Sequence, residues 1–162
     1  MLFRSPRPYP NLTVLQNVTL PGLFGTQALS MAQAQAQAMH WLDFVGLAHR
    51  AHDVPTELNL HQRKFLELAR ALANGPRLVL LDEVLAGLTP TEIEQAILTV
   101  RTIRARGSAI LFIEHNMRAV LELSDRLMVL NHGKVIADGP PREVIGQADV
   151  VSAYLGTSTK AA

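Results

Sequence analysis

The chain has 162 residues, of which 48% are apolar and 18% charged, and its formal net charge is +1. These values indicate one folded domain with its own core and argue against a disordered chain; the scattered basic residues give no signal for nucleic-acid binding. The sequence contains no cysteine, which excludes disulfides, thiolate metal sites and a cysteine nucleophile, and it has no apolar stretch long enough to cross a membrane or act as a signal peptide.

The first part of the chain is predicted to be helical. Thr13 and Gln16 form a T-x-x-Q capping box that begins one helix, which Pro21 and the following glycines end. Residues 28–47 are rich in strong helix formers and predict a second helix that stops at Gly46. The polar segment that follows is expected to be a loop, and its two histidines beside a single aspartate make a poor metal site.

A third helix is predicted to begin at Asn59. Asn59 is a good N-cap and Gln62 stands three residues later, while Gly75 is the expected end. Helical spacing predicts one apolar face that comprises Leu60, Phe65, Leu68 and Leu72.

After residue 75 the pattern changes to strands that alternate with helices. The apolar runs at 78–83 and 109–114 predict two strands that are buried on both faces. Between them, Thr89 caps a helix that ends at Gly107. A short helix, a hairpin that turns at His132 and Gly133, and two short helices complete the chain. This order predicts a parallel sheet with functional residues at the carboxyl ends of its strands.

Three polar residues follow the predicted strands and are candidates for chemistry. Asp82 can hold Mg²⁺ through water, Glu83 can orient or deprotonate an attacking water, and His115 can contact a terminal phosphate. Acidic residues commonly close buried strands, and a lone histidine is more often structural. Each residue alone would therefore also fit a structural role.

Five segments in order carry a resemblance to a known family. "LNLHQRKFLELARAL", "LVLLDE", "AGLTP", "ILFIEHNM" and "LMVLNHGKVIADGPPREV" resemble the second half of an ABC transporter ATPase. The stretches "PRPYPNLTVLQNV" and "VVSAYLG" resemble the ATP-binding subunits of branched-chain amino acid importers. The resemblance implies an α/β fold, the C-terminal part of a P-loop NTPase with a helical subdomain and a partial parallel sheet.

The resemblance also implies roles for individual residues. Asp82 matches the Walker B aspartate, Glu83 the catalytic glutamate and His115 the switch histidine. In the family, the signature sequence and the D-loop contact ATP that a second subunit holds. The residues at these positions are Asn59, Leu60, His61 and Gln62 in the signature and Thr89 in the D-loop.

The family implies three segments, two cofactors and two kinds of partner. Residues 1–75 would form the Q-loop edge, the helical subdomain and the signature helix; 76–139 the Walker B, D-loop and switch part of the catalytic core; and 140–162 a helical tail. The implied cofactors are ATP and Mg²⁺. The implied partners are a second ABC ATPase subunit, identical or merely similar, and transmembrane permease subunits, at the cytoplasmic face of the inner (plasma) membrane; nucleic acid is not among them.

The sequence departs from the family at the phosphate loop. The motif G-x-x-x-x-G-K-[S/T] does not occur, and the only Gly-Lys pair, Gly133-Lys134, is predicted to be a strand turn. In the family this loop precedes the segment that matches residues 6–14. We therefore expect a chain that lacks roughly the family's first third, binds no ATP by itself and exposes an apolar face beside strand 109–114.

Further departures concern the other ATP-contacting segments. Arg4 stands where the family has the Q-loop glutamine, and Asn59-Leu60-His61 replaces Ser-Gly-Gly. Asn59 would act either as cap and phosphate contact or as cap alone. Thr89 replaces the D-loop acid or amide, and Val84 replaces the proline after the glutamate.

Three interpretations follow from the sequence. The chain is part of an importer ATPase, or it is a regulatory or structural subunit that supplies its signature and D-loop to another ATPase. The third interpretation is an unrelated metal-dependent hydrolase that uses Asp82, Glu83 and His115, and the order of the five segments argues against it.

Overall fold

The computed structural model describes residues 2–3, 8–25 and 28–155, and the chain divides into two compact units, Met1–Ile113 and Glu114–Ala162. The first unit contains β1 (Leu2–Phe3), α1 (Val14–Phe24), α2 (Met31–Phe44), the 3₁₀ turns η1 (Ala48–Arg50) and η2 (Pro55–Glu57), α3 (Leu60–Leu72), β2 (Leu78–Asp82), α4 (Pro90–Ala105) and β3 (Ala109–Ile113). The second contains α5 (Met117–Leu123), β4 (Leu127–Asn131), β5 (Lys134–Gly139), α6 (Pro141–Val144) and α7 (Ala148–Leu155).

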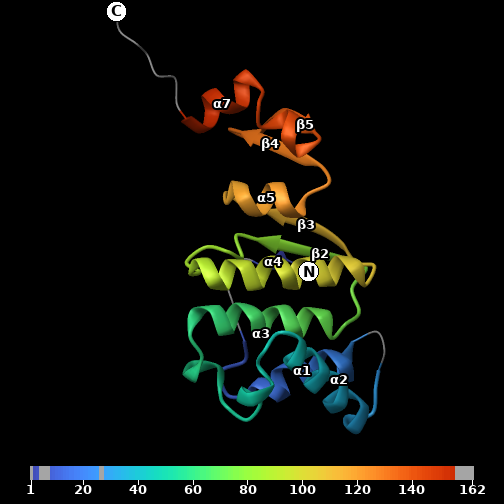
Figure 1. Ribbon diagram of the computed structural model, residues 1–162. Coiled ribbons are helices and arrows are strands. Elements are labelled where there is room, and N and C mark those ends of the chain that lie inside the picture. The colour runs from blue at the N-terminus through green and yellow to red at the C-terminus, as the bar shows by residue number, and fades with distance from the viewer. Residues whose placement is uncertain (1, 4–7, 26–27, 156–162) are drawn as a thin grey trace, which may run out of the picture. The chain divides into compact units, whose positions relative to one another are not determined.

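The helices α1, α2 and α3 gather at one end of the first unit (Figure 1). Each begins with a reciprocal capping box, at Thr13, Ser30 and Asn59, so the predicted boxes at Thr13 and Asn59 are confirmed. At Gly22 an added Cβ would lie 3.2 Å from the Cβ of Ala34, which shows how closely α1 approaches α2. The fully buried side chains of these two helices are Val14, Val18, Ala34, Ala38 and Leu42.

A buried asparagine fixes the segment that leads into α1. The Asn17 side chain is fully buried and accepts a hydrogen bond from the Tyr9 amide at 2.8 Å. Its amide group donates to the carbonyl oxygens of Tyr9, Leu12 and Thr13 at 2.9 to 3.1 Å. Because all of these partners are backbone groups, Asn17 supplies pairing that this irregular segment cannot make for itself.

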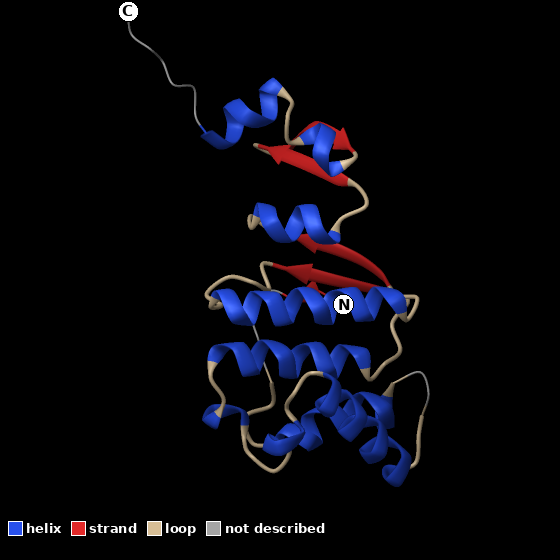
Figure 2. Ribbon diagram, in the orientation of Figure 1, coloured by secondary structure: helices blue, strands red, loops and turns tan. Residues whose placement is uncertain are grey.

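The three strands of the first unit form a parallel sheet in the order β1-β2-β3. The arrows of β2 and β3 lie beside each other in Figure 2. Residue pairs run from Leu78 beside Ala109 to Asp82 beside Ile113. The predicted parallel sheet is therefore confirmed, and the carboxyl ends of β2 and β3 lie side by side.

The two faces of this sheet differ, and of two predictions about them only one is confirmed. On β2, Val79 and Leu81 are 1% and 2% exposed, and the pocket that Leu81 lines also includes residues of α3 and α4. Leu78 on the opposite face is 49% exposed, and Leu111 and Ile113, which share that face of β3, are 56% and 51% exposed. The apolar runs predicted burial on both faces, and that prediction was wrong. The exposed apolar face expected beside strand 109–114, from the missing phosphate-loop strand, agrees with the exposure of Leu111 and Ile113.

Three smaller predictions need correction. Pro21 was expected to help end the first helix, yet it lies inside α1, which continues to Phe24. The segment expected to be a polar loop after Gly46 contains the two 3₁₀ turns η1 and η2. Leu60 was assigned to the buried face of α3, yet it is half exposed, because its direction around the helix differs from that of the three buried residues. The buried residues of that predicted face are Phe65, Leu68 and Leu72.

The second unit is built around an antiparallel hairpin of β4 and β5. His132 and Gly133 both have positive φ, +46° and +77°, which suits a two-residue turn and confirms that Gly133-Lys134 is a strand turn. The hairpin core contains Val129, Ala137, Val144 and Val150. Among the described residues, no helix combines the length and apolar character needed to cross a bilayer.

Candidate functional site

The carboxylates Asp82 and Glu83 stand where β2 ends. Asp82 is half-buried and pairs with Ile113 of β3, and the Glu83 amide donates to the Ile113 carbonyl oxygen at 2.9 Å. The Glu83 residue is exposed. The backbone of both carboxylates is thus held by the ladder between two parallel strands, at the edge of the sheet where α/β proteins bind ligands.

Glu83 begins a tight loop that leads to α4. Its φ is +49°, a left-handed conformation that is uncommon for a residue other than glycine. The Ala86 amide donates to the Glu83 carbonyl oxygen, and the Leu88 amide donates to that of Leu85, both at 3.2 Å. Gly87 also has a positive φ, +74°. Two successive turns therefore set the direction in which Glu83 leaves the sheet.

Thr89 ends this loop and caps α4. The Glu92 carboxylate accepts from the Thr89 amide at 2.7 Å and from its hydroxyl at 2.9 Å. These two hydrogen bonds lower the pKa of Glu92, because they favour the charged carboxylate. The predicted cap at Thr89 is confirmed, and its side chain is engaged within its own helix end.

The signature position forms the first turn of α3. Asn59 Oδ1 accepts from the Gln62 amide at 2.8 Å, and Gln62 Oε1 accepts from the Asn59 amide at 3.0 Å. Two of the four predicted signature residues, Asn59 and Gln62, thus cap the helix with their side chains. The exposed Leu60 reaches the neighbouring loop, because a Cβ added at Gly87 would lie 3.4 Å from Leu60 Cδ2.

His61 connects this turn to the start of α4. Its Nδ1 lies 3.4 Å from Glu92 Oε1, and its ring stands edge-on to Phe65 with centroids 4.4 Å apart. Burial lowers the pKa of His61, the Glu92 carboxylate partly offsets this, and Lys64 lowers it further. Nε2 of His61 is buried and has no hydrogen-bond partner among the described residues.

His115 belongs to the second unit and follows β3 by two residues in the chain. Its side chain is 66% exposed, and its amide donates to the carboxylate of the preceding Glu114 at 3.2 Å. Arg4, at the Q-loop position, lies outside the described residues.

Asp82, Glu83 and Thr89 lie along the segment that joins β2 to α4. The first turn of α3, with Asn59 to Gln62, approaches this segment through Leu60. Within the described part of the chain, no three His, Cys, Asp or Glu side chains gather as a metal-binding group. One half-buried carboxylate fits Mg²⁺, which keeps several waters and takes further ligands from a nucleotide's phosphates. The residues present therefore fit the acidic half of an ATP and Mg²⁺ site, and the sequence contains no phosphate loop for the other half.

Sequence reasoning missed one polar side chain at this site, Lys64 of α3. Its ammonium group donates to backbone carbonyl oxygens of the loop after β2. The only signal in the sequence was a lysine two residues after the signature position. Without the tertiary structure, it looked like an ordinary surface residue of a helix.

The family model described as "ABC transporter" matches residues 1–86, more than half of the chain. This chain belongs to the ABC transporter family. Its fold is the α/β fold of the ABC ATPases, as the resemblance implied. The match includes the signature position and the end of β2, so two of the five segments that suggested the family lie within the matched part.

Curated relatives of this ABC transporter chain include ATP-binding proteins of amino acid transport. The high-affinity branched-chain amino acid transport ATP-binding protein BraF of Pseudomonas aeruginosa is 33% identical, over 95% of this chain and 66% of BraF. LivG of Salmonella typhimurium, with the same description, is 36% identical over 96% of this chain and 64% of LivG. The chain thus spans slightly less than two thirds of the length of these relatives.

Solved structures agree with the family. An ATP-binding cassette of an ABC transporter in its ADP conformation is 28% identical, with a TM-score of 0.78 over 95% of this chain and 66% of that one. A dimeric cassette in a post-hydrolysis state with ADP and Pi is 26% identical, with a TM-score of 0.77 over 87% of this chain and 62% of that one.

Proposed function

We propose that this chain supplies the signature, Walker B, D-loop and switch segments of an ATP-hydrolysing subunit of an amino acid importer, with branched-chain amino acids as its first candidate substrates. The observation that carries the proposal is the position of Asp82 and Glu83 at the carboxyl end of β2, in a chain of the ABC transporter family. The similarity to BraF and LivG supports the choice of substrate.

In this proposal each site residue has one task. Asp82 helps to hold Mg²⁺ through water, and Glu83 orients the attacking water and accepts its proton. His115 contacts the terminal phosphate. The first turn of α3 and Thr89 face the ATP that a second ATPase subunit binds. When bound, Mg²⁺ supplies charge that stabilises the phosphoryl group during its transfer.

The proposed partners follow from the family. The chain would pair with a second ATPase subunit, identical or similar, and dock on transmembrane permease subunits at the cytoplasmic face of the inner membrane. The dimeric solved cassette supports the pairing of subunits. The three-segment division at residues 75 and 139 stays part of this proposal.

A second candidate function is regulatory. The chain would then lack hydrolysis of its own and supply its signature and D-loop to another ATPase subunit. One observation favours keeping it: Asn59 and Leu60, at the start of α3, are exposed and so can be reached by another subunit.

Two measurements separate these functions. Reading the DNA upstream of the Met1 codon in all frames tests for an in-frame phosphate loop. ATP turnover is then measured for the product of that whole reading frame, with its neighbouring subunits. Glu83→Gln should lower kcat by at least about 100-fold while ATP still binds. Glu94→Gln, on the exposed side of α4, is the matched control and should retain turnover.

The outcome assigns the function. Turnover that requires Glu83 supports the hydrolytic subunit. Turnover by a partner that rises when this chain is added, and no longer rises with Asn59→Leu, supports the regulatory subunit. If Glu83→Gln leaves turnover unchanged and no partner responds, both proposals are wrong.

A further inference from the structure

Lys64 joins the signature helix to the loop that carries the proposed catalytic residue. It lies in the second turn of α3, and its Nζ donates to the carbonyl oxygens of Val84 at 3.1 Å and Ala86 at 2.5 Å. A third, longer hydrogen bond reaches the carbonyl oxygen of Glu83 at 3.4 Å. A single ammonium group therefore contacts three nearly consecutive carbonyl groups of one loop.

These carbonyl groups belong to a loop, where no helix or strand hydrogen bonds fix the backbone. Glu83 is in the left-handed region, Gly87 has a positive φ, and the segment lies between the end of β2 and the start of α4. Carbonyl oxygens that point the same way repel one another, and a cation among them removes that repulsion while it satisfies them. The loop geometry thus depends on a charge that comes from another element.

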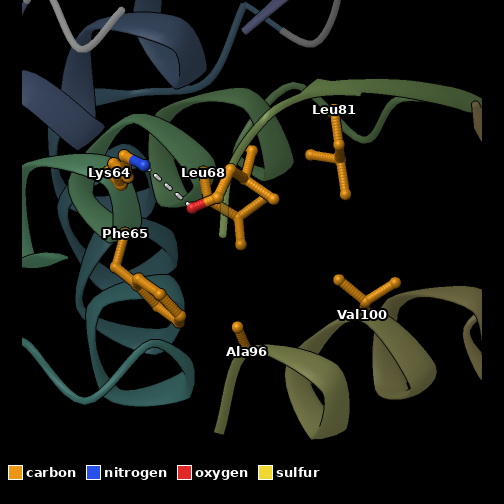
Figure 3. A pocket seen from close by; sticks show the side chains of 7 residues that line it. Lys64, Phe65, Leu68, Leu81, Ala96 and Val100 are labelled. Carbon is orange, nitrogen blue, oxygen red and sulfur yellow. Dashed lines mark hydrogen bonds between the residues drawn. The ribbon is translucent and has the colours of Figure 1, made fainter. Parts of the chain in front are cut away.

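The stem of Lys64 is itself held in place. Together with Phe65 and Leu68 of α3, Leu81 of β2, and Ala96 and Val100 of α4, it lines a small apolar pocket (Figure 3). The ammonium lies at the rim of this pocket, where the dashed line in Figure 3 leads from Lys64 to a backbone oxygen. Contact between the stem and apolar side chains restricts its rotamers, so the charge is directed at the loop.

A neighbouring basic residue does not share this task. Arg63 donates through Nε to the Leu58 carbonyl oxygen at 2.8 Å, within its own segment. Lys134, the other lysine of the described residues, lies on β5 in the second unit. Lys64 is therefore the lysine whose position suits a link between α3 and the loop after β2.

We propose that Lys64 is a positioning residue that fixes the backbone of residues 83–86, and through it the direction of the Glu83 carboxylate and the start of the D-loop at Ala86. The catalytic consequence rests on the function proposed above, whereas the backbone consequence does not. Any movement of the first turn of α3 would reach Glu83 through this lysine.

The backbone part is tested by hydrogen exchange on the whole chain, with three variants. Lys64→Met keeps a stem of similar length and removes the donors, Lys64→Arg keeps the charge, and Lys134→Met controls for the loss of a lysine. In Lys64→Met, peptides that cover residues 83–89 should exchange at least about tenfold faster, because charged hydrogen bonds are lost. Lys64→Arg should restore part of the protection, and Lys134→Met should change nothing there.

Two results would overturn the positioning role. One is unchanged exchange at residues 83–89 in Lys64→Met. The other is a rise of equal size in α1 and α2, which would make Lys64 a contributor to the stability of the whole unit instead.

The catalytic part uses the complete ATPase with its partner subunits. Lys64→Met should lower kcat at least about tenfold with the KM for ATP unchanged, and Lys64→Arg should recover part of it. An unchanged kcat beside faster exchange would overturn the link from loop to catalysis. If the wild type itself shows no turnover in any assembly, the proposed function fails, and the exchange experiment still decides the role of Lys64 in the backbone.

Discussion

The helical region and the sheet of the first unit bury their apolar residues to different extents. The helices α1 and α2 enclose side chains such as Val14, Val18 and Leu42 completely. The sheet covers Val79 and Leu81 on one face, while Leu111 and Ile113 on the other remain half exposed. The helical region thus finds its packing partners within the described residues, and one face of the sheet does not.

This difference shows that apolar composition and burial are separate properties. The strands β2 and β3 are as apolar as a strand covered on both faces, and the chain folds them into a parallel ladder. Their exposed face gains less from the hydrophobic effect than the buried one, because its side chains are only about half buried. Mutations can measure how much each region contributes.

The largest contrast is expected between two leucines of the sheet. Leu81→Ala should lower the free energy of unfolding by about 3 kcal/mol, because it leaves a cavity against α3 and α4. Leu111→Thr, on the exposed face, should change it by less than about 0.5 kcal/mol. Urea unfolding of both variants provides the measurement. Equal losses would mean that the exposed face is covered in solution.

The helical region should be most sensitive at its buried polar residue. Asn17→Ala removes four hydrogen bonds to backbone groups and should cost about 2–3 kcal/mol. Gln35→Ala, at an exposed position of α2, is the control and should be neutral within about 0.5 kcal/mol. A loss below about 1 kcal/mol in Asn17→Ala would show that water forms hydrogen bonds with the backbone groups that Asn17 pairs in the wild type.

A smaller loss is expected at the end of α1. A Cβ at Gly25 would overlap the carbonyl oxygen of Pro21 and the side chain of Asn74, so Gly25→Ala should cost about 1–2 kcal/mol. At Gly146 the nearest atom would be 3.8 Å away, and Gly146→Ala should be tolerated. The melting temperatures of the two variants, each compared with the wild type, provide the measurement. Equal midpoints would show that the helical region adjusts more readily than its packing suggests.

The smallest effect is a pH dependence at the junction of α3 and α4. Burial lowers the pKa of His61 below its ordinary 6.5, so the unfolded chain takes up this proton at a higher pH than the folded chain. The associated stability is complete above pH 6.5 and decreases as the pH falls below it. His61→Gln should therefore lose less Tm than the wild type between pH 7.5 and 5.5.

The exposed His52 offers the matched control for this titration. His52→Gln should keep the wild-type change of Tm over the same range. If His61→Gln and the wild type lose the same Tm, the folded state does not disfavour protonation of His61.

Local features were predictable from the sequence because neighbouring residues determine them. The caps at Thr13, Asn59 and Thr89 and the hairpin turn at His132 involve partners within three residues or less. The order of strands and helices also predicted the parallel sheet and the position of Asp82 and Glu83 at a strand end.

Features that depend on distant residues were not predictable. An apolar run does not distinguish a strand covered on one face from a strand covered on both. The exposed face at Leu111 and Ile113 was expected only from the family resemblance, and its residues needed the structure. The partners of Lys64 are 19 to 22 residues away in sequence, and no periodic pattern marks them. The positive φ of Glu83 likewise depends on the strand and loop around it, because glutamate has no preference for that region.

The strand pairings also determine the order in which parts of the chain can fold during synthesis. The hairpin of β4 and β5 closes through two residues, and hairpins of this kind form within microseconds. Leu2 of β1 pairs with Leu80 of β2, so this ladder encloses the whole helical region and cannot form until β2 has left the ribosome. At about 5–20 residues per second, β1 waits several seconds during synthesis for its partner β2. The helices between the two strands therefore have time to fold before this ladder closes.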